Sequence, residues 1–231
     1  MLTLVIGGAA SGKSEYAESA VLELPGHRIY LATMQAYDDE GRARVEKHRR
    51  NRADKGFETV EQSVNLEEAI PRIPAGSNVL LEDLTNLVAN ERYRPEKFAP
   101  AEAAGLPRDE QGEPSVHSDT AGIGGNEENL DAPDEVPVQP SLTPDVFRGK
   151  TDEERILGAL RQLADHCGHL TIVTGEVFSG GDSYDEETLA YMRTLARLNI
   201  ALAREADRVA EIVCGYPNIL KEPFFCDKVW L

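Results

Sequence analysis

The sequence of 231 residues is short of cysteine and has no long hydrophobic run. Its three cysteines, Cys167, Cys214 and Cys226, form no C-x-x-C pair, which argues against a zinc site or a disulfide framework. The apolar runs are much shorter than a membrane-spanning helix, and no basic leader precedes the first of them. We therefore expect a cytoplasmic protein without a membrane span.

Positive charge is scarce as well. The chain has 24 Lys and Arg residues against 41 Asp and Glu residues, which gives a formal net charge of -17. Such a chain repels nucleic acids and anionic membranes, so neither is an expected partner, and an anionic ligand requires a local basic site. Hydrophobic residues make up 41% of the chain, enough for the core of one domain, alone or with an appendage.

The strongest motif occupies the first fourteen residues. The apolar run 2–6 predicts a buried strand, and residues 7–14 (GGAASGKS) complete the P-loop pattern G-x-x-x-x-G-K-S before a segment with helical spacing. The glycines leave backbone N–H groups open to a phosphate chain at the start of that helix. Lys13 would then contact the β- and γ-phosphates of a nucleotide, and the Ser14 hydroxyl would ligate Mg²⁺.

Strands and helices alternate along the rest of the chain. Strands are predicted at residues 2–6, 28–32, 57–61, 78–82, 169–174 and 208–214, with a short edge strand at 228–231. Helices are predicted at 14–24, 37–52, 65–72, 84–92, 152–166 and 185–205. This alternation predicts an α/β fold with a mostly parallel sheet and helices on both faces.

Two polar residues mark the ends of apolar strands. Thr33 follows the strand 28–32, and Glu82 ends the strand 78–82. Open α/β sheets bind ligands at the carboxyl ends of their strands, so Thr33 is a candidate site residue, although its position fits an ordinary loop threonine equally well. A carboxylate in the place of Glu82 would hold Mg²⁺ opposite Ser14, as in a Walker-B motif, and the alternative is a simple acidic turn.

The predicted helix 37–52 gathers the strongest basic cluster of this acidic chain. Its members are Arg42, Arg44, Lys47, His48, Arg49, Arg50 and Arg52. A solvated charged helix is the ordinary interpretation, but here the cluster is also the obvious counter-charge for a triphosphate. On the pattern alone, a functional role for His48 remains the less favoured of two alternatives.

The composition changes between residues 95 and 150. This stretch has four basic residues against twelve acidic ones, holds eight of the 13 prolines and lacks apolar periodicity. We predict a single P-loop nucleotide-binding domain over residues 1–231, interrupted at about 94–150 by an acidic, flexible insertion. An ordered lid or an interaction arm is the alternative for this insertion.

Taken together, these motifs resemble a known family. The matching segments, in order, are VIGGAASGKSEYAE, YLATMQAYDDEGRARVEKHRRNR, LLEDLTNLVAN, IVTGEVFSGG and MRTLARLNIALAREADRV. They are similar to the bifunctional adenosylcobinamide kinase/adenosylcobinamide-phosphate guanylyltransferase of cobalamin biosynthesis. The resemblance covers about residues 1–93 and 155–221 and leaves out the acidic insertion.

The resemblance implies two reactions on a corrinoid substrate. ATP or GTP phosphorylates the aminopropanol hydroxyl of adenosylcobinamide, and GMP is then transferred from GTP to the new phosphate through a GMP–histidine intermediate. By motif position the nucleophile is His48, with Lys13 as the second catalytic residue, and Ser14 and Glu82 hold Mg²⁺. The implied nucleotide-contacting positions are Gly7, Gly8, Ala9, Ala10, Ser11, Gly12, Lys13, Ser14, Ala32, Thr33, Met34, Arg49, Arg50, Asn51, Arg52, Glu61 and Glu82. The family also implies a RecA-like P-loop fold and a homotrimer.

Two other functions compete with this interpretation. The chain can be a different P-loop kinase or ATPase in which His48 has no role, and it would then bind nucleotide without forming GMP–protein. It can also be a nucleotide-gated interaction protein whose acidic insertion binds a basic partner. Lys13 and Glu82 in one chain with His48 favour the enzyme.

Overall fold

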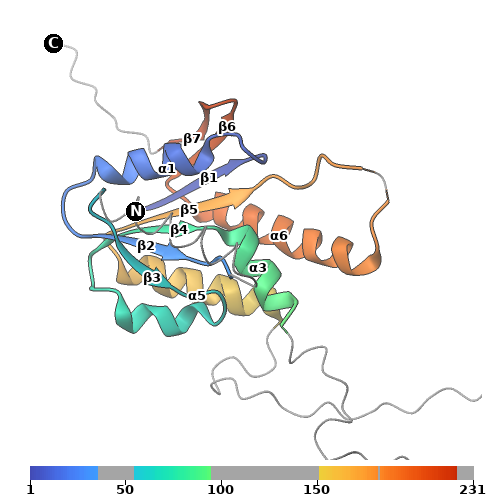
Figure 1. The fold of residues 1–231 in the computed structure, drawn as a ribbon, viewed down its shortest axis with the longest axis horizontal. Helices are drawn as coiled ribbons and strands as arrows, with labels where there is room; N and C mark the ends of the chain where they lie inside the picture. The colour runs from blue at the N-terminus through green and yellow to red at the C-terminus, as the bar shows by residue number, and fades with distance from the viewer. Residues whose placement is uncertain (36–54, 95–150, 182, 223–231) are drawn as a thin grey trace, which may run out of the picture. The chain divides into compact units, whose positions relative to one another are not determined.

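A computed structural model describes residues 1–35, 55–94, 151–181 and 183–222. Seven strands form one sheet in the order β3-β2-β4-β5-β1-β6-β7, and every neighbouring pair is parallel except β6 and β7 (Figure 1). The strands are β1 (Leu2–Gly7), β2 (Arg28–Ala32), β3 (Glu58–Glu61), β4 (Asn78–Glu82), β5 (His169–Gly175), β6 (Arg208–Val213) and β7 (Tyr216–Lys221).

Helices cover both faces of this sheet. They are α1 (Lys13–Leu22), the 3₁₀ helix η1 (Leu66–Arg72), α3 (Leu84–Arg92), α5 (Asp152–His166) and α6 (Glu186–Glu205). One buried cluster joins α1 to Val5, Leu80 and Val173 of the central strands, and a larger one joins the other four helices to the opposite face (Figure 1). The predicted α/β P-loop class, with a mostly parallel sheet and helices on both faces, is therefore confirmed.

The central strands have few polar residues because both of their faces are covered. Leu4 and Ile172 point to the α3–α5–α6 side, whereas Val5 and Val173 point to the α1 side, and all four are almost fully buried. Successive side chains of a strand alternate between its faces, so a strand in the middle of three layers reads as a continuous apolar run.

Most predicted elements are present within a residue or two of their expected bounds, with two differences. Residues 66–72 form a 3₁₀ helix rather than an α-helix, and Pro71 leaves the last turn of this helix without one backbone N–H donor. Strand β7 (Tyr216–Lys221) was not predicted, since Pro217 and six exposed residues give it no buried apolar signal. The predicted helix 37–52, most of the insertion and the predicted edge strand 228–231 lie outside the described residues.

A buried ionic network joins the two helices that flank the insertion. Glu91 of α3 is 1% exposed and accepts hydrogen bonds from the guanidinium of Arg155 on α5, with 3.1 Å between Arg155 Nη1 and Glu91 Oε1. It also accepts from Arg94 and, at 2.6 Å, from the backbone N–H of Asn65. The segments before and after the insertion thus pack into one compact unit.

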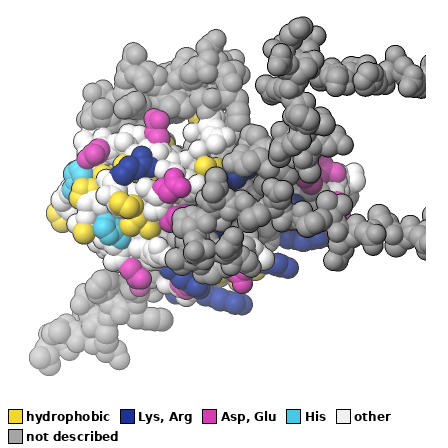
Figure 2. Space-filling model, turned by 90° about the horizontal axis from the view of Figure 1, so that it is seen from below, with side chains coloured by type: hydrophobic (Ala, Val, Ile, Leu, Met, Phe, Trp, Pro, Cys, Tyr) yellow, Lys and Arg dark blue, Asp and Glu magenta, His cyan; other side chains and the backbone are white. Residues whose placement is uncertain are grey.

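The outer surface on the α5 side has a mixed character. Figure 2 shows acidic, basic and hydrophobic side chains distributed over the described part of this face. Exposed ion pairs such as Arg161–Glu205, between α5 and α6, neutralise part of the charge in this layer. No helix in the described ranges is long and apolar enough to cross a membrane.

Candidate functional site

The P-loop connects β1 to α1 at the carboxyl edge of the sheet. The backbone of Gly12 has a φ of 91°, in the left-handed region, and its C=O accepts the N–H of Tyr16 to begin α1. The N–H of Gly215, in the turn between β6 and β7, donates to Ser11 C=O at 2.8 Å, so this hairpin braces the loop. The loop therefore lies where the strand, the helix N-terminus and the hairpin meet.

The glycines of the loop differ in how much space surrounds them. A Cβ on Gly7 would lie 2.8 Å from the backbone oxygen of Ile212, and one on Gly12 would lie 3.2 Å from Gly215 Cα. A Cβ on Gly8 would meet no atom within 4 Å. The fold itself thus requires glycine at positions 7 and 12, whereas the bare backbone at Gly8 faces open space, as expected where a phosphate chain approaches.

Lys13 and Ser14 begin the helix at the mouth of this loop. The Lys13 ammonium donates to Gly8 C=O at 3.2 Å, which keeps the charge above the loop. The Ser14 hydroxyl donates a hydrogen bond to the carboxylate of Glu82. Two predicted site residues that lie 68 positions apart in the sequence are therefore in direct contact.

Glu82 stands in an unusual environment at the end of β4. Burial raises the pKa of its carboxyl to about 7; the neighbouring Asp83 adds to the rise, whereas the Ser14 hydrogen bond and the Lys13 charge oppose it. Its Oε2 atom is buried and has no hydrogen-bond partner among the described residues. A buried carboxylate oxygen without a donor, beside a hydroxyl, matches the oxygen ligands that Mg²⁺ prefers.

The part of the chain that the structure describes offers two oxygen ligands here, the Ser14 hydroxyl and the Glu82 carboxylate, which suits magnesium bound together with a nucleotide. Among the described residues no group of three or more His, Cys, Asp or Glu side chains is placed to hold a metal. Mg²⁺ keeps several waters and takes its other ligands from substrate phosphates, so two protein oxygens suffice. Ser14 and Glu82 thus fit the group that the P-loop implies.

The strand register gathers three further predicted positions. Ala32 at the end of β2 is paired with Glu61 of β3 on one side and with Glu82 of β4 on the other. Thr33 is fully buried and its hydroxyl bonds to the backbone of Asp83, whereas Met34 is 46% exposed. The sheet edge thus brings Ala32, Thr33, Glu61 and Glu82 together, with Glu61 exposed to solvent.

Five predicted site residues lie outside the described residues, namely His48, Arg49, Arg50, Asn51 and Arg52. Their expected roles therefore remain predictions. The predicted basic helix 37–52 lies within the same stretch of chain, between the described residues 35 and 55.

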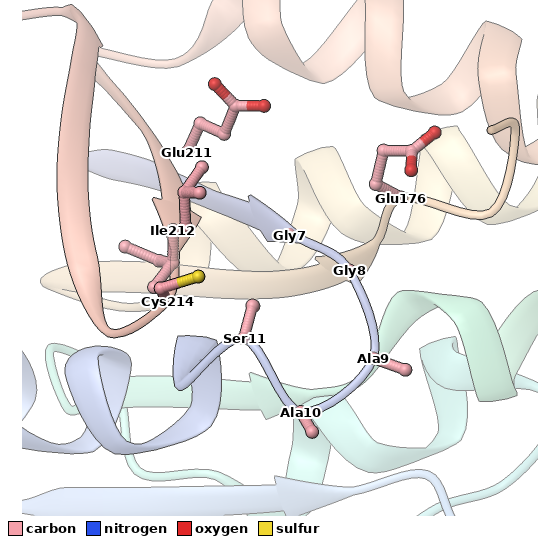
Figure 3. A pocket seen from close by; sticks show the side chains of 10 residues that line it. Gly7, Gly8, Ala9, Ala10, Ser11, Glu176, Glu211, Ile212 and Cys214 are labelled. Atoms are coloured by element: carbon pink, nitrogen blue, oxygen red, sulfur yellow. The ribbon is translucent and has the colours of Figure 1, made fainter.

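A cavity of about 340 Å³ lies beside the P-loop. Glu176 after β5 and Glu211 of β6 extend toward the same side of the loop, and Cys214 lies beside Ser11 (Figure 3). The lining residues are Gly7, Gly8, Ala9, Ala10, Ser11, Glu176, Glu211, Ile212, Val213 and Cys214. Carboxylates accept hydrogen bonds and repel phosphates, so this side suits the hydroxyl or amino groups of a nucleoside. Glu211 and Cys214 belong to no motif, and no sequence signal marks them.

The chain is similar to known proteins of one family. The family model described as cobinamide kinase/cobinamide phosphate guanyltransferase (CobU) matches residues 3–220. Over 91 residues the chain is 43% identical to the bifunctional adenosylcobalamin biosynthesis protein CobU of Escherichia coli strain K12, and 38% identical to that of Salmonella typhimurium strain LT2. Each of these alignments covers 39% of this chain, and the chain spans about half (49%) of the length of the curated relatives it matches.

Solved structures include a distant neighbour. The crystal structure of flagellar accessory protein FlaH from Methanocaldococcus jannaschii aligns with 96% of this chain and 78% of its own, with a TM-score of 0.39 and 8% identity. The fold assignment rests instead on the sheet order and the strand–loop–helix geometry described above.

Proposed function

Because the chain belongs to the cobinamide kinase/cobinamide phosphate guanyltransferase family, we propose that it is a bifunctional enzyme of cobalamin biosynthesis. Its substrates are a nucleoside triphosphate and adenosylcobinamide. It phosphorylates adenosylcobinamide with ATP or GTP and then transfers GMP from GTP to adenosylcobinamide phosphate, which gives adenosyl-GDP-cobinamide. Both steps use one P-loop site.

The contact between Ser14 and Glu82 is the observation that carries this proposal. It places a hydroxyl and a buried carboxylate at the start of α1, beside Lys13 and the open backbone of Gly8. Bound Mg²⁺ supplies charge neutralisation for the phosphates, and Ser14 and Glu82 would hold it. The chain's own N–H groups and Lys13 would orient the triphosphate for attack.

In the kinase step, the acceptor hydroxyl oxygen attacks the γ-phosphorus. The new P–O bond forms as the bond to the β–γ bridging oxygen breaks, the nucleoside diphosphate leaves, and the hydroxyl proton passes to solvent or to a carboxylate. Lys13 would stabilise the charge that develops on the transferring phosphoryl group.

In the guanylyl transfer, a neutral imidazole nitrogen of His48 attacks the α-phosphorus of GTP. The P–N bond forms and pyrophosphate leaves; the phosphate of the corrinoid then attacks the same phosphorus, and the P–N bond breaks to free the histidine. Support for His48 comes from its place in the segment that resembles the family and from the arginines that follow it. Those arginines would stabilise the negative charge that develops on the transferring phosphoryl group.

The assembly and the location of the protein follow from the same resemblance. We propose a cytoplasmic homotrimer, which light scattering of the purified full chain will test through its molar mass. A monomer would contradict the trimer without affecting the chemistry.

Two labelled nucleotides test the proposed reactions. Incubation with GTP labelled at the α-phosphate and Mg²⁺ is expected to leave acid-labile label on the denatured protein, and His48→Ala is expected to abolish it. GTP labelled at the γ-phosphate serves as the matched control and is expected to leave none. If nucleotide binds but no α-label forms, guanylyl transfer is refuted, and a P-loop kinase or ATPase without it becomes the better description.

A further inference from the structure

Thr33 makes three hydrogen bonds to the acidic turn Glu82–Asp83 at the carboxyl edge of the sheet. Its side-chain hydroxyl donates to Asp83 C=O at 2.8 Å and accepts the N–H of Asp83, also at 2.8 Å. Its backbone N–H donates to Glu82 C=O at 3.1 Å. One residue at the end of β2 thus holds both residues of the acidic turn that ends β4.

These bonds leave the Thr33 hydroxyl occupied. The residue is 0% exposed, and its single hydroxyl proton is donated to Asp83 C=O. Thr33 is itself fixed from behind, because the side-chain amide of Asn90 donates to Thr33 C=O at 2.7 Å. The side chain is therefore turned toward the protein rather than toward the space above the P-loop.

The acidic turn is held from its other end as well. The Asp83 carboxylate accepts the N–H of Asn86 at 2.7 Å and caps α3, and the Thr85 hydroxyl accepts the N–H of Gly175 on β5 at 2.7 Å. The backbone of the turn is thus tied to β2 through Thr33, its Asp83 side chain is tied to α3, and α3 is tied to β5 through Thr85. The Glu82 backbone is held by the Thr33 N–H, and its side chain accepts a hydrogen bond from the Ser14 hydroxyl.

We propose that Thr33 is a positioning residue, whose hydroxyl fixes the Glu82–Asp83 turn so that the Glu82 carboxylate meets Ser14 in the geometry that binds magnesium–nucleotide. The proposal rests on the proposed function, since it gives this turn its role in that nucleotide site. It differs from the direct nucleotide contact that the sequence resemblance implies for Thr33. Groups that orient a metal ligand from behind typically change metal affinity by about 10- to 100-fold when they are replaced.

The test measures binding rather than turnover. The affinity of the full chain for a fluorescent N-methylanthraniloyl GTP is measured in EDTA and across a Mg²⁺ titration. Thr33→Val keeps the shape of the side chain and removes the hydroxyl. We expect unchanged affinity in EDTA, because Lys13 and the loop are intact, and about a tenfold rise in the Mg²⁺ concentration needed for half of the Mg²⁺-dependent gain.

Three variants separate positioning from general destabilisation. Thr33→Ser keeps the hydroxyl and is expected to restore the wild-type Mg²⁺ requirement, whereas Thr33→Ala is a second hydroxyl-free variant in case the valine does not fold. Thr171→Val removes a hydroxyl from an equally buried threonine of β5, whose register partners are Thr3 and Leu80 rather than the acidic turn. It is expected to bind Mg²⁺ and nucleotide like the wild type.

Each outcome decides the question. An unchanged Mg²⁺ requirement in the hydroxyl-free variants, or a raised one in Thr33→Ser, would overturn the positioning role. Loss of affinity in EDTA would instead identify Thr33 as a direct nucleotide contact. A wild-type chain that binds no nucleotide in either condition would refute the proposed function and this inference together.

Discussion

Removing the charge of Glu91 is expected to destabilise the folded protein strongly, because this side chain is 1% exposed and paired with a buried arginine. Glu91→Gln keeps the volume of the side chain but leaves the Arg155 guanidinium buried without its main counter-charge. Burial by itself would lower the pKa of Arg155, and the hydrogen bonds and charge of Glu91 outweigh it, so the pKa is raised. The ion pair is therefore what makes a buried arginine tolerable at this position.

The size of the effect follows from the burial of the pair. Breaking a buried ion pair from one side costs about 3–5 kcal/mol. Two weaker neighbours lie near Arg155, with Glu67 Oε1 at 3.9 Å and Asp152 Oδ1 at 3.8 Å, which places the expected loss at the low end of that range. A loss of about 3 kcal/mol lowers the melting temperature by about 6–12 °C in a domain of this size.

Urea denaturation at pH 7, followed by tyrosine fluorescence and circular dichroism, measures the loss of unfolding free energy. The exposed pair Arg161–Glu205 provides the matched control, and Glu205→Gln is expected to cost less than about 1 kcal/mol. The double variant Glu91→Gln with Arg155→Met removes the uncompensated charge and is expected to be more stable than Glu91→Gln alone.

The same measurement also tests the independence of the folded unit. We propose that the segments before and after the insertion form one domain, and replacing residues 95–150 with a short Gly-Ser linker is expected to leave the cost of Glu91→Gln unchanged. A loss below 1 kcal/mol in the full chain, or a double variant weaker than the single one, would refute the reasoning about the buried charge.

Further predictions follow from the loop, the metal ligands and the thiols. Gly12→Ala is expected to destabilise the protein by about 1–2 kcal/mol in denaturant, because a side chain is strained at a φ of 91°. Gly8→Ala is expected to keep wild-type stability and to weaken nucleotide binding in a fluorescence titration, because its Cβ meets only the space that the ligand would enter; equal binding would contradict the phosphate site. Glu82→Gln is expected to keep nucleotide affinity in EDTA and to lose the gain that Mg²⁺ brings, and an intact gain would exclude Glu82 as a ligand. Burial raises the pKa of the Cys167 thiol to about 11, so at pH 8 only about one in a thousand of these thiols is ionised; iodoacetamide followed by peptide mapping is expected to modify the exposed Cys214 and spare Cys167 in the native protein, with Cys214→Ser as control.

The sequence by itself determined the elements whose signals are local. Strand β4 and helix α3 were predicted with their observed bounds, because an apolar run and the helical spacing of Leu84, Leu87 and Val88 lie within a few residues of each other. The P-loop was equally clear, since glycine, lysine and serine at fixed spacing describe a single turn of backbone.

Local signals failed where a residue's partner lies far away in the sequence. Nothing near Thr33 shows that its hydroxyl faces Asp83 rather than a ligand, because that contact depends on the pairing of β2 with β4. Strand β7 was missed because it forms only by pairing with β6 at the edge of the sheet, with no buried face of its own.

Tertiary structure alone decided how the site is assembled. Ser14 and Glu82 meet because β1 and β4 run parallel in one sheet with only β5 between them, so both strands end at the same edge. The brace from Gly215 to Ser11 and the carboxylates of Glu176 and Glu211 beside the loop likewise come from strands that are distant in sequence. The physical reason is that strand order and register are set by long-range packing of the whole sheet, which no short segment of sequence contains.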